Sequence, residues 1–364
     1  MKLIAVGDVV VARRPSLTRD GDLSAGTSAL PLLRDADLVI GNLEVPLTDT
    51  GHPAEKPVAF RVGTGTAPEL ARLGFDACSL ATNHALDYGI DGLRSTRAAL
   101  DRAGVAHAGA GEDLDEALRA VRLTGRNGAE AAFLSLCSAL PPGFNATSRR
   151  PGIAPVRIEQ SYEFDGVLLE EQPGTVPYVR TRAREEDVER AEEAIRRAKA
   201  LAGTVVVAVH WGVPWCYLPD NQGPLAEYQQ PLGRRLVDAG ADLVIGHHPH
   251  CLHPVERYRD GLILYSTGNF LFHPCEEVAP PDRRPAARYK DRMSDRPWFE
   301  SAAFEVCLGD GPPRLRLHPV ELTTDGEPAI PSASTARRIL RHVEELSREL
   351  NPSTRVDEEG HVHF

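Results

Sequence analysis

The chain has 364 residues, 42% of them hydrophobic, so it can bury a substantial core in one large α/β domain or in two ordinary ones. Its net charge of −11 argues against nucleic acid as a partner, because the summed positive field that draws proteins to phosphate backbones is missing. No stretch approaches the roughly 20 apolar residues that a membrane span needs, and the N-terminus lacks a hydrophobic segment of signal-peptide length. We therefore expect a globular protein with no membrane partner, and a cytoplasmic location unless a signal peptide has been removed.

Short apolar runs alternate with amphipathic stretches, a pattern typical of strands interleaved with helices. Strands are expected at residues 2–6, 37–40, 75–80, 131–137, 204–209, 242–245 and 262–265. Helical periodicity predicts helices at residues 89–103, 185–201, 225–239 and about 335–350. Residues 301–322 alternate instead like antiparallel strands. The sequence therefore predicts an α/β fold.

Two segments lack a regular pattern. Residues 139–180 are rich in proline, and residues 273–298 are rich in proline and arginine. Both are too long for simple connections, so we expect them to cover a site rather than merely to join elements. Neither is typical of a domain linker. We therefore expect residues 1–325 to form one domain, with residues 326–364 as a C-terminal helix and tail packed on it.

Side chains that can bind a metal follow the predicted strands with unusual regularity. They are Asp8, Asn42 and Glu44, Asn83 and His84, His210, and the trio His247, His248 and His250. In open α/β sheets ligands bind beyond the carboxyl ends of the strands, so we expect these side chains to converge on one crevice. Imidazole, carboxylate and carbonyl donors together favour Mn, Zn or Fe over the all-oxygen sites of Mg and Ca.

The most secure ligands are His210, His248 and His250. Three imidazoles within residues 247–250, on a turn that contains Pro249, are hard to explain by packing. The set offers enough donors for one ion or for two. Paired ions lie ~3.5–4 Å apart and share a bridging carboxylate, for which Glu44 and Asp8 are the candidates.

His84 and Asp87 form a candidate catalytic pair. They are three residues apart at a helix start, so the carboxylate can fix the tautomer of the imidazole and raise its basicity. His84 is then a general acid beside the metal centre. The alternative is an ordinary helix-capping turn at Asn83, since asparagine caps helices well.

The candidate substrate contacts are Asn42, Arg149, Arg150, Trp211 and His247. The arginines could clamp a phosphate or a carboxylate, or they could belong to a solvated basic loop. The same alternatives hold for Arg283, Arg284 and Arg288. Trp211, with Trp215, Tyr217 and Trp298, predicts a partly apolar wall, although core packing explains Trp211 almost as well.

The motifs in order are GDVV (7–10), GNLEVPLT (41–48), ATNHALDYGIDGL (81–93), VVVAVHWG (205–212), GADLVIGHHPH (240–250) and YSTGNFLF (265–272). Together they resemble the CapA family, named after poly-γ-glutamate capsule synthesis, within the calcineurin-like metallophosphoesterase superfamily. The resemblance implies a four-layered α/β/β/α sandwich with Mn, Fe or Zn at the strand ends.

By position, the resemblance implies that Asp8 is the opening carboxylate, Glu44 the bridging or nearby acid, Asn83 the amide ligand, His84 the catalytic histidine, and His210, His248 and His250 the three imidazoles. Two departures from the phosphoesterase pattern stand out. Val10 occupies the place of a histidine ligand, and Gly41-Asn42 replaces Gly-Asp. We expect these changes to weaken one metal subsite, and His210, His248, His250 and Asn83 to form the better-defined one.

Three functions remain open from the sequence. The first is a metal-dependent hydrolase or acyl-transfer enzyme that acts on an amide, peptide-like or γ-glutamyl substrate. The second is a phosphomonoesterase or phosphodiesterase with the same metal centre. The third is a non-catalytic component of poly-γ-glutamate synthesis. A small-molecule or peptide-like substrate is the expected partner, and the oligomeric state is open.

Overall fold

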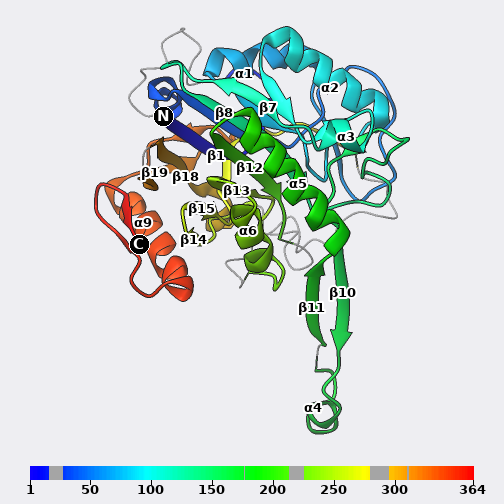
Figure 1. Ribbon diagram of the computed structural model, residues 1–364, viewed down its shortest axis with the longest axis vertical. Coiled ribbons are helices and arrows are strands. Elements are labelled where there is room, and N and C mark those ends of the chain that lie inside the picture. The colour runs from blue at the N-terminus through cyan, green and yellow to red at the C-terminus, as the bar shows by residue number, and fades with distance from the viewer. Residues whose placement is uncertain (16–27, 176, 213–224, 279–294, 310) are drawn as a thin grey trace.

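Two large β-sheets form the centre of the fold in a computed structural model (Figure 1). The structure describes all residues except 16–27, 176, 213–224, 279–294 and 310. The ten-stranded sheet has the order β21-β22-β19-β18-β1-β2-β4-β5, and β16 and β20 add to β1 and β19. Its strands are β1 (Lys2–Val10), β2 (Leu38–Leu43), β4 (Ala77–Ser79), β5 (Ala106–Ala108), β16 (Asn269–Phe272), β18 (Glu300–Gly309), β19 (Gly311–Leu322), β20 (Pro328–Ala329), β21 (Arg355–Val356) and β22 (His361–His363). β1, β2, β4, β5 and β16 run parallel.

The six-stranded sheet has the order β14-β15-β13-β12-β8-β7. Its strands are β7 (Val121–Thr124), β8 (Glu130–Cys137), β12 (Thr204–His210), β13 (Leu243–His247), β14 (Val255–Tyr258) and β15 (Gly261–Leu264). The four central strands are parallel, and the two outer ones are antiparallel to their neighbours. Three small sheets pair β3 (Ala59–Arg61) with β17 (Glu276–Val278), β6 (Ala110–Gly111) with β9 (Gly152–Ile153), and β10 (Ile158–Glu163) with β11 (Tyr178–Ala183).

The helices pack mainly on the outer faces of these sheets. They are η2 (Leu30–Asp35), η3 (Thr64–Thr66), α1 (Ala67–Leu73), α2 (Gly89–Ala103), α3 (Leu114–Ala117), α4 (Gly166–Glu171), α5 (Glu185–Leu201), α6 (Gln229–Asp238), α8 (Arg296–Phe299) and α9 (Ala333–Leu350). None of the described helices is long and apolar enough to cross a membrane.

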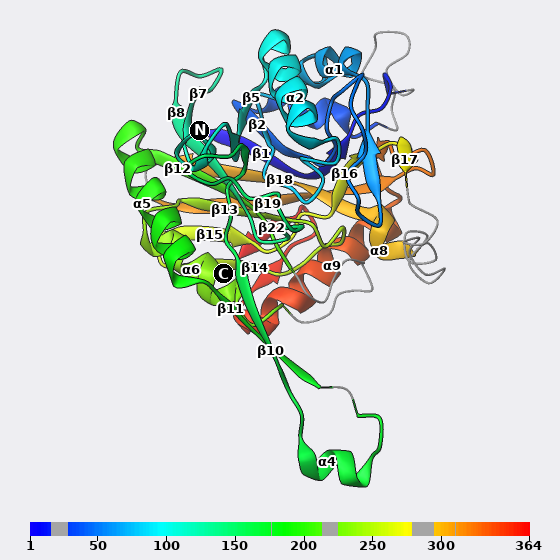
Figure 2. The same ribbon diagram turned by 90° about the vertical axis from the view of Figure 1, so that its right-hand side faces the viewer.

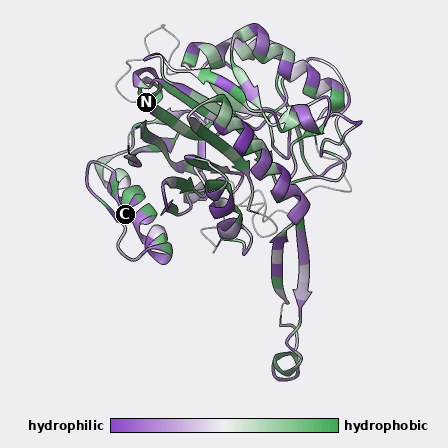
Figure 3. Ribbon diagram, in the orientation of Figure 1, coloured by the Kyte–Doolittle hydropathy of each residue, from purple (hydrophilic) through white to green (hydrophobic). Residues whose placement is uncertain are grey.

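Successive side chains of the central strands enter different cores, as the period of two along a strand requires. Leu3 of β1 and Val206 of β12 share one apolar core between the two sheets. Ile4 faces a second core with α1 and α2, and Val207 faces a third with α5 and α6. Figure 3 shows these strands as the most hydrophobic part of the ribbon. Burial on both faces explains why they are continuous apolar runs.

The α/β class and the strands and helices expected from the sequence are confirmed, and residues 301–309 and 311–322 lie in the antiparallel strands β18 and β19. The expected helix at residues 225–239 is shorter, because α6 begins only at Gln229.

The second half of the proline-rich segment 139–180 does not cover the site, although a cover was expected from the sequence. The hairpin of β10 and β11, with α4 at its tip, forms an arm that projects from the body in both views (Figures 1 and 2). The backbone N–H and C=O groups of the hairpin form hydrogen bonds between its two strands, rather than contacts over a site. The earlier part stays on the body, where the ring of Phe144 lies 5.6 Å from Lys56 Nζ.

Replacing Gly246 by alanine should lower the free energy of unfolding of the metal-free protein by about 3 kcal/mol, the upper end of what overpacking usually costs. A Cβ at this position would lie 2.1 Å from the carbonyl oxygen of Tyr265, a backbone atom that cannot move without shifting a buried segment. Urea denaturation measures the loss. The control is Gly203→Ala, where a Cβ meets nothing within 4 Å, and equal losses in the two variants would contradict this account.

Candidate metal centre

The metal-capable side chains lie where the parallel strands of both sheets end. Asp8 of β1 is in register with Asn42 of β2 and with Asn269 of β16. In the other sheet, His210 of β12 is in register with His247 of β13. The two sheets therefore bring residues from distant parts of the chain to one buried cluster.

The first donor group contains Glu44, Asn83, His210 and His248. His210 Nε2 lies 2.8 Å from Asn83 Oδ1, 3.0 Å from His248 Nδ1 and 3.6 Å from Glu44 Oε1. Burial, followed by the neighbouring His248, holds the pKa of His210 well below its usual range. Burial also lowers the pKa of His248 to about 3. Both imidazoles are therefore neutral at pH 7, as metal ligation requires.

The second donor group contains Asp8, Glu44 and His250. His250 Nδ1 lies 3.1 Å from Asp8 Oδ2 and 2.8 Å from Asn269 Oδ1, and His250 Nε2 lies 3.5 Å from Glu44 Oε1. Burial lowers the pKa of His250, but Glu44 and Asp8 outweigh it and raise the pKa to about 9. Without a metal, His250 is thus the cation between two carboxylates.

Glu44 belongs to both groups and gives the clearest test of whether a metal fits. Its side chain is fully buried, and neither carboxylate oxygen has a hydrogen-bond partner among the described residues. Burial and the nearby Asp8 charge raise its pKa well above the usual range. A bound cation would supply the missing partner. The ligand atoms of Glu44, His210 and His248 lie within 4.8 Å of one another, and so do those of Asp8, Glu44 and His250. The residues therefore fit a metal centre in which Glu44 is common to both donor groups.

The turn that carries the histidines has an unusual backbone. His248 and His250 have φ angles of 96° and 56°, in a region that residues with side chains rarely adopt. The two positive φ angles flank Pro249. Local strain of this kind persists only where the surrounding structure holds it in place, and it concentrates at functional sites.

His84 and Asp87 form a hydrogen-bonded pair next to the donor groups. His84 Nδ1 lies 2.7 Å from Asp87 Oδ2, and the fully buried Asp87 also accepts from Phe60 N. Lys56 Nζ donates to Asp87 Oδ1 at 2.7 Å and lies 3.2 Å from His84 Nδ1. Burial, then the Lys56 charge, lowers the pKa of His84, and Asp87 only partly opposes them. His84 is therefore a neutral imidazole with Nδ1–H fixed toward Asp87, which leaves Nε2 as a proton acceptor.

Two of the predicted substrate contacts, Asn42 and His247, lie next to side chains of the donor groups. Asn42 Nδ2 donates to Asp8 Oδ1 at 2.8 Å and lies 3.3 Å from His210 Nδ1, so its amide orients both side chains. His247 is buried, with Nδ1 3.2 Å from Thr267 Oγ1 and 3.7 Å from Asp8 Oδ1. Burial lowers the pKa of His247 to about 4.

The motifs that build this cluster are those of a known family. The profile described as bacterial capsule synthesis protein PGA_cap matches residues 2–274, a span that includes every donor of both groups. The chain belongs to this family.

Several relatives of this PGA_cap chain are similar over about two thirds to three quarters of its length. The PGA biosynthesis protein CapA of Bacillus subtilis is 30% identical over 271 residues, which cover 73% of this chain and 62% of that protein. An uncharacterized protein of Sinorhizobium fredii is 31% identical over 313 residues, covering 74% of this chain and 66% of its own. A probable polyglutamine synthesis accessory protein of Mycobacterium tuberculosis is 31% identical over 244 residues, covering 65% and 55%. The chain thus spans less than two thirds of the length of these relatives.

The predicted ligands are divided between the two donor groups in a different way from the one expected. His250 lies with Asp8 and Glu44, whereas His210 and His248 form the other group, so the three imidazoles do not share one subsite as expected. The reason is the turn at Pro249, whose two positive φ angles separate the histidines on either side. Val10 is completely buried in the apolar core and supplies no ligand to the Asp8 group.

Trp211 does not line a substrate wall, which corrects the prediction. The side chain is completely buried, its ring stacks on Tyr265, and its Nε1 donates to the carbonyl oxygen of Tyr265. Trp298, another residue expected in the wall, does lie beside the cluster: Trp298 and Phe272 pack against the His250 ring with centroids 4.8 and 5.6 Å away.

The contacts of the predicted arginine clamp stay within its own loop. Arg150 donates to the carbonyl oxygen and to Oδ1 of Asn145, and the Arg149 amide donates to Thr147 Oγ1. Trp215, Tyr217, Arg283, Arg284 and Arg288 lie outside the described residues.

Lys56 and Asn269 were not among the residues predicted from the sequence. Lys56 lies in a segment without periodicity, so only the fold shows that it reaches Asp87. Asn269 had a detectable signal, since it is a polar residue in the YSTGNFLF motif and follows an apolar run.

Replacing Glu44 by glutamine should weaken the binding of Mn or Zn at least about 100-fold, more than the loss of an outer hydrogen-bond partner costs. The amide preserves the shape but loses the charge that both donor groups share. Elemental analysis after dialysis and titration calorimetry measure the change. The matched control is Glu305→Gln, because Glu305 pairs with His318 away from the cluster. Unchanged metal content in Glu44→Gln would contradict the bridging role.

Proposed function

We propose that this chain is a metal-dependent hydrolase or acyl-transfer enzyme that acts on an amide, peptide-like or γ-glutamyl substrate. The observation that carries the proposal is the buried Glu44 carboxylate, which has no hydrogen-bond donor among the described residues and belongs to both groups of metal-capable side chains. The relatives supply the substrate class, since two of them are named for the synthesis of PGA and of polyglutamine.

The mixture of imidazole, carboxylate and amide donors favours Mn, Zn or Fe. Asn83, His210, His248 and Glu44 would hold one ion, and Asp8, His250 and Glu44 a second. When bound, such a metal supplies a Lewis acid for the substrate carbonyl and lowers the pKa of water to about 7. The three apolar cores support the four-layered α/β/β/α sandwich that places these donors at the strand ends.

The chain's own residues provide the path of the proton. The Nδ1–H of His84 is held by Asp87, so Nε2 can take a proton from the attacking water and pass it to the leaving nitrogen. His84 then acts as a base before it acts as the acid inferred from the sequence. Its lowered pKa suits the first of these roles. Trp298 and Phe272, beside His250, would exclude bulk water from the reacting carbonyl.

In the metal-loaded protein, His84→Asn should lower kcat for a chromogenic γ-glutamyl amide by about 10²–10⁴-fold, the usual contribution of a positioned acid–base group. Metal content should stay the same, because His84 belongs to neither donor group. His318→Asn is the control, since His318 pairs with Glu305 away from the cluster. A chromogenic phosphodiester tested in parallel discriminates the rival activity. Cleavage of the diester alone would overturn the proposal in favour of a phosphoesterase, and no turnover of either by metal-replete protein would favour a non-catalytic role.

The pH profile gives a second test of His84. Because His84 must first accept a proton, kcat/KM should fall on the acid side as its pKa is crossed. The Lys56 charge lowers that pKa, so Lys56→Met should raise it and move the acid limb to higher pH. Lys199→Met is the control, since Lys199 pairs with Asp242 away from the site. An acid limb that stays in place in Lys56→Met would exclude His84 as the base.

A further inference from the structure

The arm formed by β10, α4 and β11 carries most of the exposed apolar surface that the structure describes. Seven large hydrophobic side chains are exposed in the described residues, and five of them belong to the arm. They are Tyr162, Phe164, Val167, Leu168 and Tyr178, with Val167 75% exposed. A two-stranded hairpin is at best marginally stable alone in water, and a projecting apolar tip marks an interaction surface.

The arm has unpaired negative charge at its tip and arginines nearer its base. Glu170 and Glu171 at the tip are exposed and make no ion pair within the described part of the chain. The arginines lie nearer the base, where Arg182 pairs with Glu159 across the hairpin and Arg180 pairs with Glu163. The tip therefore combines apolar side chains with uncompensated negative charge.

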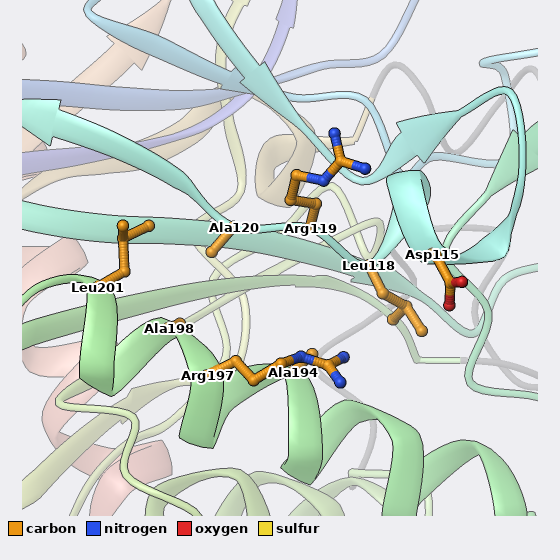
Figure 4. Close-up of a pocket in the computed structure, with 8 residues that line it drawn as sticks. All are labelled: Asp115, Leu118, Arg119, Ala120, Ala194, Arg197, Ala198 and Leu201. Atoms are coloured by element: carbon orange, nitrogen blue, oxygen red, sulfur yellow. The ribbon is translucent and has the colours of Figure 1, made fainter.

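Helix α5, which follows the arm directly, has the opposite order of charge. Its first turn is acidic, with Glu185 and Glu186 exposed, whereas Arg196, Arg197 and Lys199 are exposed near its end. The basic end borders a groove of about 480 Å³ between α5 and the segment that starts at α3. Figure 4 shows Ala194, Arg197, Ala198 and Leu201 of α5 on one side of this groove, and Leu118, Arg119 and Ala120 on the other.

The groove matches the arm tip in chemistry. Leu201 is itself one of the seven exposed large hydrophobic side chains, so the arm and the groove together hold all of them except Ile330. Arg119 is exposed and makes no ion pair among the described residues. The lining has two arginines and one acid, Asp115, and Arg197 also lies 3.7 Å from Glu193. The unpaired Arg119 and the apolar floor therefore make the groove suited to an acidic apolar tip.

The dimensions match as well. The six residues of β10 span about 20 Å at about 3.3 Å per residue, and α4 extends the arm further. The groove residues 194–201 lie about 14–24 Å along α5 from its start, at 1.5 Å per residue. The arm leaves the body at the start of α5 and points away from it (Figure 1). A two-fold axis near that point therefore lays the arm of one copy along α5 of another, with the tip at the groove.

We propose that two copies of this chain associate through reciprocal docking of each arm along the partner's α5, with the tip in the groove formed by α5 and residues 118–120. The reversed charge order of the arm and α5 makes this antiparallel pairing self-complementary, and its two-fold symmetry closes the assembly. The acidic tip argues against an anionic lipid surface, which would repel it. The inference is independent of the chemistry of the metal centre.

Sedimentation velocity on the full metal-loaded chain tests the proposal by charge exchange. Glu170→Arg with Glu171→Arg, and separately Arg119→Glu with Arg197→Glu, should each raise the dissociation constant of the dimer at least about tenfold, because like charges then face each other. The variant that combines all four substitutions should regain the dimer. Restoration by combination cannot result from misfolding of either parent variant. Arg341→Glu on α9 is the control, because Arg341 is exposed and α9 lies on the other side of the body from the arm (Figure 1), so the dimer should be unchanged.

A shortened arm gives an independent test. Glu163 and Tyr178 are paired across the hairpin, so an Asn-Gly turn can replace residues 164–177 and still close it. This variant should be monomeric with unchanged metal content and circular dichroism. The proposal is overturned if the native chain stays monomeric at all concentrations or if the variant with the shortened arm still dimerises. It is also overturned if the variant with all four charge substitutions does not regain the dimer. Binding of the monomeric native chain to vesicles through the arm would also overturn it.

Discussion

The site depends on one electrostatic constraint, the burial of two carboxylates side by side. Asp8 and Glu44 are both completely buried, and Glu44 has no hydrogen-bond donor within the described residues. Isolated buried charges of this kind cost several kcal/mol each unless cations or donors accompany them. His250, with its pKa raised to about 9, is the cation that the chain itself provides. The remaining imidazoles are held neutral by burial, so a divalent ion that replaced the proton of His250 would balance the two carboxylates.

Close backbone contacts bring the strand ends to this cluster. A Cβ at Gly7 would lie 2.0 Å from the carbonyl oxygen of Gly268, and one at Gly246 would lie 2.1 Å from that of Tyr265. Glycine at both positions lets the ends of β1 and β13 approach the segment before β16. The two sheets are otherwise held together by apolar side chains that alternate between cores, which fixes the register of each strand but not the approach of the ends.

The fold was predictable to the extent that burial imposes a period on the sequence. Strands buried on both faces and helices with one apolar face give clear patterns, and donors that follow such strands must lie at one edge. The grouping of those donors was not predictable in the same way. His250 joins Asp8 because of two positive φ angles around Pro249, and no local sequence rule predicts positive φ at histidine. Trp211 follows a strand just as His210 does, yet it turns into the core. Lys56 reaches Asp87 only through tertiary contacts.

The two donor groups are also a structural connection between the sheets. Glu44 and Asn83 follow strands of the ten-stranded sheet, whereas His210 and His248 come from the six-stranded sheet. The second group is divided in the same way, with Asp8 and Glu44 on one side and His250 on the other. An ion in either group must therefore be bound by both sheets at once, so its binding free energy adds to the apolar packing between them. The alignment of the sheets and the affinity for metal are then one coupled property, and a substitution in the core between the sheets can alter the site without touching any ligand.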